Sequence, residues 1–102
     1  MPSVDGSAVR KLVVACDAGM GSSVMLAGTL KKQLKGTEVS VMHTPVAQIP
    51  SDADVVVCHV GLAERARQVY PDGVIVPFRL FLGDPAVTAV VQKILKGGVI
   101  DG

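Results

Sequence analysis

The stretch of sequence that decides the fold runs Leu12-Val13-Val14-Ala15-Cys16-Asp17-Ala18-Gly19-Met20-Gly21-Ser22-Ser23. Its first four residues are a short apolar run, which is typical of a central strand buried on both faces. A turn with two glycines follows the cysteine, and two serines then open a helix that we expect at residues 22–35. A strand, a glycine-containing turn and a helix in this order predict an α/β domain.

The rest of the chain continues the alternation of strands and helices. Further strands are predicted at residues 39–43, 54–59 and 74–76, and further helices at residues 62–69 and 84–95. This alternation favours an open parallel sheet with helices on both faces. The predicted fold class is therefore α/β, a single three-layer domain in which a four-stranded parallel sheet of order 2-1-3-4 is flanked by helices.

The composition narrows the class of protein. The chain has 102 residues, enough for one domain, which we expect at residues 10–98 between a flexible N-terminus at residues 1–9 and a C-terminal tail at residues 99–102. The formal net charge is +1, so there is no broad basic field for nucleic acid. The apolar runs are far shorter than a membrane span requires, and residues 1–6 lack the apolar run of a secretion signal. The sequence predicts a soluble, cytoplasmic protein.

Cys16 and the turn that follows it have the features of a phosphate site. Glycines allow backbone conformations that direct N–H groups inward, and a helix start adds free N–H donors and a positive partial charge. These donors favour the thiolate, which can attack phosphorus. We predict that Cys16 is the catalytic nucleophile and that its phosphate loop consists of Asp17, Ala18, Gly19, Met20, Gly21, Ser22 and Ser23. The N–H groups neutralise the phosphate charge, so no metal or cofactor is expected. The alternative is a buried structural cysteine before an ordinary turn.

This loop also resembles that of a known family. The string from Cys16 to Ser23 is similar to the active-site loop of the enzyme IIB component of the bacterial sugar phosphotransferase system, most of all the mannitol type. The resemblance extends over His59, residues 62–66 and the order of the elements. It implies a phosphocysteine at Cys16, a phosphohistidine on an enzyme IIA partner as donor, and a sugar held by the membrane enzyme IIC partner as acceptor. The protein would then work at the cytoplasmic face of the membrane, attached through its transporter partner.

Two other classes of function compete with this interpretation. Small cysteine phosphatases of the low-molecular-weight type use a Cys-x5-Arg loop and an Asp-Pro general acid, and Asp84-Pro85 fits the second feature. However, Ser22 stands where the arginine is needed, and Asp84-Pro85 is fully explained as the N-cap and first-turn proline of the last predicted helix. A phosphate-responsive regulatory module is the second alternative, although the sequence contains no recognisable DNA-binding element.

Three further residues have open roles. His59 follows the third predicted strand and is an auxiliary candidate that donates to the phosphoryl group, or else it only caps the end of the strand. Cys58 is either a small core residue or the partner of Cys16 in a redox switch. Arg79 is either a phosphate contact or a solvated loop residue.

Overall fold

The fold is built on a four-stranded parallel sheet. The structure is a computed structural model and describes residues 3–16, 21–80 and 83–101, with residues 21–23 described by their backbone alone. The strands of this sheet lie in the order β3-β2-β4-β5, and their bounds are β2 Lys11–Cys16, β3 Ser40–Pro45, β4 Val55–His59 and β5 Val74–Phe78. In chain order this is the arrangement 2-1-3-4, so the predicted topology is confirmed.

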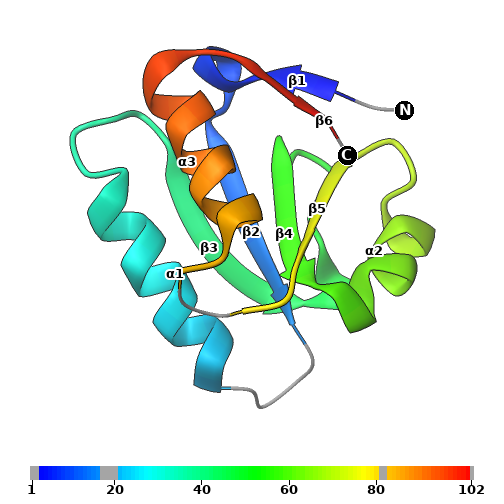
Figure 1. The fold of residues 1–102 in the computed structure, drawn as a ribbon. Coiled ribbons are helices and arrows are strands. Elements are labelled where there is room, and N and C mark those ends of the chain that lie inside the picture. Colours follow the sequence, from blue (N-terminus) through cyan, green and yellow to red (C-terminus); the bar gives the residue numbers. More distant parts are fainter. Residues whose placement is uncertain (1–2, 17–20, 81–82, 102) are drawn as a thin grey trace.

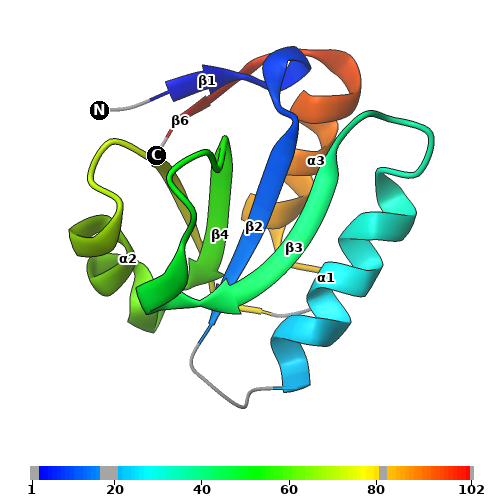
Figure 2. The same cartoon turned by 180° about the vertical axis from the view of Figure 1, so that it is seen from behind.

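Helices cover both faces of the central sheet, which makes three layers (Figure 1 and Figure 2). Helices α1 (Gly21–Gln33) and α3 (Pro85–Lys96) lie on one face, and α2 (Ala63–Val69) lies on the other. Gly36, with a φ of 90°, adopts a left-handed conformation soon after α1 ends. Among the described residues, short 3-10 helices lie at Gly6–Ala8 (η1), Val46–Gln48 (η2) and Val60–Leu62 (η3).

Alternate residues of the central strands belong to two different cores. In β4, Val55 and Val57 pack with residues of α1 and α3, whereas Val56 and Cys58 pack with residues of α2. Successive side chains of a strand point to opposite faces of its sheet, so a strand covered on both faces has to be apolar throughout. The same alternation tells which face each residue at the strand ends occupies.

A second, two-stranded sheet joins the two ends of the chain. Strand β1 (Ser3–Asp5) pairs antiparallel with β6 (Val99–Asp101), and the backbone N–H of Gly6 donates to the carbonyl of Gly98 at 2.7 Å. The sequence did not predict this sheet, because it placed these residues in a flexible N-terminus and a C-terminal tail. Three-residue strands are too short to show a period, and Ile100 of β6 is buried in the core on the α3 side.

The carboxyl ends of the four parallel strands all meet at one edge of the central sheet, far from β1 and β6 (Figure 1). From β2 the chain goes to β3 on one side, while β4 pairs with β2 on the other side, so the strand order reverses at β2. Ligands of such sheets bind beyond the carboxyl ends of the strands at this reversal. Within the described ranges, no helix combines the length and the apolar character that crossing a bilayer requires.

Candidate functional site

Cys16 lies at this reversal, as the last residue of β2. Its side chain is nearly buried, with 8% of the residue exposed, and the thiol donates a hydrogen bond to the carbonyl oxygen of Thr44 at 3.5 Å. Thr44 belongs to β3, and Cys16 itself stands opposite Pro45 in the pairing of the two strands. The neighbouring strand therefore holds the sulfur at the carboxyl edge of the sheet.

The predicted phosphate loop is only partly within the described residues. Asp17, Ala18, Gly19 and Met20 lie outside them. Gly21, Ser22 and Ser23 form the first turn of α1, where backbone N–H groups have no acceptor within the helix and the helix dipole is positive. This first turn contains no acidic residue, whereas Lys31 and Lys32 stand in the last turn. The start of α1 therefore provides donors for an anion on the face of the sheet that α1 covers.

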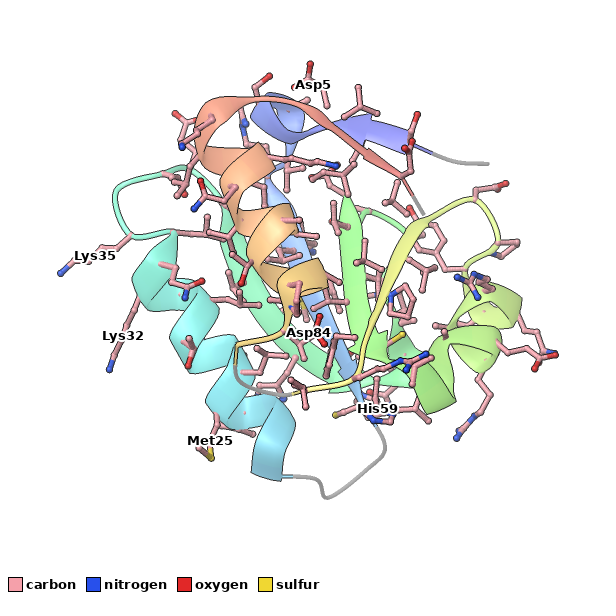
Figure 3. All side chains as sticks on the ribbon, in the orientation of Figure 1. Asp5, Met25, Lys32, Lys35, His59 and Asp84 are labelled. Carbon is pink, nitrogen blue, oxygen red and sulfur yellow. The ribbon has the colours of Figure 1, made fainter. Side chains whose placement is uncertain are left out.

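His59 is the last residue of β4, the other neighbour of β2, and it occupies the same face as Cys16. Ala15 pairs with Cys58, so Cys16 and His59 each follow the last matched pair by one residue. Alternation then directs both side chains to the α1 and α3 side, opposite to Ala15 and Cys58. Figure 3 shows His59 at the carboxyl end of β4, beside the end of β2.

Gly61 and Phe78 are contacts of the His59 imidazole among the described residues. Its Nδ1 accepts a hydrogen bond from the backbone N–H of Gly61 at 3.1 Å, so the side chain caps η3. Its ring meets Phe78, the last residue of β5, edge to face with 6.1 Å between ring centroids and 88° between ring planes. Phe78 is buried in the core on the α1 and α3 side, which confirms the face that the alternation assigns to His59.

Cys58 is a core residue on the opposite face. It is completely buried among residues that pack against α2. Burial raises the pKa of its thiol to about 11, against a smaller lowering effect of Arg67, so the thiol stays protonated at neutral pH. A disulfide needs Cβ atoms about 4 Å apart that approach each other. Because Cys58 and Cys16 leave the sheet on opposite faces, the arrangement does not fit a redox switch between them.

Asp84 caps α3, as the sequence predicted, and both oxygens of its carboxylate accept hydrogen bonds (Figure 3). One oxygen accepts from the N–H groups of Arg79 at 2.8 Å and Leu80 at 3.0 Å, and the other accepts from Ala86 at 2.8 Å. Burial works to raise the pKa of this carboxyl group, but these backbone hydrogen bonds outweigh burial and lower it. An ionised carboxylate held in this way is a poor general acid, which removes the second element of the phosphatase interpretation. The side chain of Arg79 is exposed.

Thr44 is a residue of this region that sequence reasoning missed. Its carbonyl accepts the Cys16 thiol, and its side chain is buried with 8% of the residue exposed. Its hydroxyl has no hydrogen-bond partner within the part of the chain that the structure describes. No signal in the sequence pointed to it, because the predicted strand stopped at His43, whereas β3 continues to Pro45. Within the same described part, no group of three or more His, Cys, Asp or Glu side chains could hold a metal ion.

Comparison with protein families decides which family this site belongs to. Residues 11–93 match the model of the family described as "PTS system, Lactose/Cellobiose specific IIB subunit", where PTS denotes the phosphotransferase system. The match covers most of the chain, including Cys16, Thr44 and His59. The chain belongs to this IIB family. The resemblance read from the Cys16 loop is thereby confirmed.

Relatives of this IIB domain carry mannitol-specific names. The chain is 39% identical over 90 residues to the "PTS system mannitol-specific EIICB component" of Bacillus subtilis, which covers 86% of the chain and 19% of that relative. It is 37% identical over 94 residues to the "PTS system mannitol-specific EIICBA component" of Escherichia coli, covering 89% of the chain and 15% of that relative. The chain thus spans about a fifth or less of the length of these relatives.

Proposed function

We propose that this IIB domain carries a phosphoryl group on Cys16, between a phosphohistidine of an enzyme IIA partner and a sugar held by an enzyme IIC partner. The observation that carries the proposal is the position of Cys16, which ends the strand at which the sheet order reverses and precedes the N-terminus of α1. A thiol at that position meets both requirements of a phosphoryl carrier, a nucleophile and a set of N–H donors for the anion.

The reaction consists of two transfers that balance. In the first, the phosphorus–nitrogen bond of the donor breaks, a phosphorus–sulfur bond forms on Cys16, and the thiol proton goes to the released imidazole nitrogen. In the second, a hydroxyl oxygen of the sugar attacks the phosphorus, the phosphorus–sulfur bond breaks, and the hydroxyl proton returns to the sulfur. The predicted loop of residues 17–23 supplies the N–H donors that hold the phosphoryl oxygens in both transfers.

The partners and the acceptor follow from the relatives. Their names combine IIC and IIB, and in one case IIA, in one chain, so we infer that this domain exchanges phosphoryl groups with a IIA and a IIC unit. Work at the cytoplasmic face of a membrane transporter is part of the same proposal. Because the two relatives compared above are named as mannitol-specific, mannitol is the first acceptor to test.

Decay of the phosphoprotein separates a carrier from a phosphatase. The full chain would be phosphorylated by a phosphorylated IIA domain, isolated, and followed in buffer alone and with vesicles that contain the IIC unit and mannitol. A carrier without the loop arginine holds its phosphoryl group against water, so we expect slow decay in buffer and fast loss only with IIC and mannitol together. Rapid hydrolysis of p-nitrophenyl phosphate that is lost in Asp84→Asn, which keeps one acceptor oxygen for the cap but has no acidic proton, would establish the phosphatase instead.

A stable phosphoprotein that gives its phosphoryl group to no sugar would favour the regulatory module. The vesicle experiment therefore needs a panel of sugars and sugar alcohols besides mannitol. Discharge by any member of the panel supports the carrier and identifies its acceptor.

A further inference from the structure

The contacts of His59 determine which of its ring nitrogens carries a proton. Nδ1 accepts from the Gly61 N–H at 3.1 Å, so Nδ1 presents a lone pair and holds no proton. In the neutral ring the proton then resides on Nε2, which becomes the hydrogen-bond donor of the side chain. The edge-to-face contact with Phe78 limits rotation of the ring about its side-chain bonds. The result is a half-buried donor with a fixed tautomer at the carboxyl edge of the sheet.

Strand register brings this donor next to Cys16. The two residues stand at the same level of adjacent parallel strands, one position beyond the Ala15–Cys58 pair. Adjacent strands are about 4.8 Å apart, and both side chains leave the sheet on the α1 and α3 face. The thiol of Cys16 contacts the Thr44 carbonyl of β3 on the other side of β2, so a phosphoryl group on the sulfur has to reach the His59 side of the carboxyl edge for this contact to form.

We propose that His59 donates a hydrogen bond from Nε2–H to an oxygen of the phosphoryl group on Cys16, and that Gly61 and Phe78 position it for this role. The proposal rests on the proposed function of Cys16 and adds a side-chain donor to the backbone donors of the loop. His59 keeps its Nε2 proton throughout, so the bonds and protons of both phosphoryl transfers balance as before. A donor aimed at an anion also helps most when charge moves onto the phosphoryl oxygens.

The competing interpretation is that His59 only caps η3 through Nδ1. Two substitutions separate the two roles, because each replaces the hydrogen-bonding function of one ring nitrogen and removes that of the other. In His59→Asn, the amide oxygen replaces Nδ1 as the acceptor of the Gly61 N–H, and asparagine is a strong capping residue. In His59→Gln, the longer side chain places an amide N–H near the position of Nε2 and loses the cap.

The rate of Cys16 phosphorylation by a phosphorylated IIA domain, with the thermal midpoint of the full chain as control, distinguishes these cases. We expect His59→Asn to keep the thermal midpoint of the wild type but to slow transfer about 10-fold to 100-fold, the usual effect of losing a hydrogen bond to a charged group. We expect His59→Gln to lower the thermal midpoint but to keep transfer within about 5-fold of the wild type.

Transfer by His59→Asn at the wild-type rate would overturn the proposal, as would equal losses of transfer in the two variants. If the wild-type chain takes no phosphoryl group on Cys16, the proposed function itself fails and the role of His59 fails with it. Slowed transfer in His59→Asn alone, with wild-type labelling at Cys16, supports both.

Discussion

Replacement of Asp84 by alanine tests how the loop between β5 and α3 is held. The carboxylate accepts three backbone hydrogen bonds, from Arg79, Leu80 and Ala86, and only 7% of the residue is exposed. Loss of a helix N-cap costs about 0.5–2 kcal/mol, and a partly buried N–H left without an acceptor costs about 1–3 kcal/mol. We therefore expect Asp84→Ala to lower the free energy of unfolding by about 2–4 kcal/mol at pH 7, a large part of the total for a small domain.

Urea denaturation of the full chain at several pH values measures this loss. The pKa of Asp84 is lowered on folding from 3.8, so the stabilisation is fully present above that value and disappears as the pH falls through the folded pKa. The difference between wild type and Asp84→Ala should therefore shrink below about pH 4. Asp84→Asn is the matched control, because it keeps one acceptor oxygen and should lose about 1–2 kcal/mol. A loss below about 0.5 kcal/mol at pH 7, or one that grows on acidification, would refute this account of the loop.

Two glycines and Thr44 give the remaining predictions about stability. A Cβ on Gly6 would collide with the backbone carbonyl of Lys93, so Gly6→Ala should lower the free energy of unfolding by about 1–3 kcal/mol, measured by urea denaturation. A Cβ on Gly28, inside α1, meets nothing within 4 Å, so Gly28→Ala should raise the free energy of unfolding by about 0.5–1 kcal/mol. If Gly6→Ala were the more stable of the two variants, the packing of η1 on α3 would be contradicted. Thr44→Val removes a buried hydroxyl that has no hydrogen-bond partner among the described residues, so thermal unfolding should show unchanged or higher stability. A loss above about 1 kcal/mol would show that the hydroxyl is paired.

The four-stranded sheet could be predicted because its signals are local. The apolar run of β4 can be read within a few residues, because a strand buried on both faces is apolar throughout. The cap at Asp84 is equally local, since it depends on an acidic residue directly before a proline.

The features that the sequence did not predict depend on contacts between residues that are distant in the chain. Pairing of β1 with β6 brings together the two ends of the chain, and neither three-residue strand has a pattern of its own. Thr44 reaches Cys16 only through the register of β3 on β2, which residue spacing does not reveal. The sequence left two roles open for His59, and the contacts of its ring with the Gly61 N–H and with Phe78 became visible only in three dimensions.

The most direct test of the central claim is to locate the phosphoryl group by peptide mass spectrometry. The full chain, Cys16→Ser and Cys58→Ala would each be incubated with a phosphorylated IIA domain and digested under conditions that preserve phosphocysteine. We predict one phosphoryl group on Cys16 in the wild type and in Cys58→Ala, because Cys58 faces the opposite core. In Cys16→Ser we predict that no phosphocysteine forms. A phosphoryl group found on His43 or His59 while Cys16 remains unmodified would contradict the account.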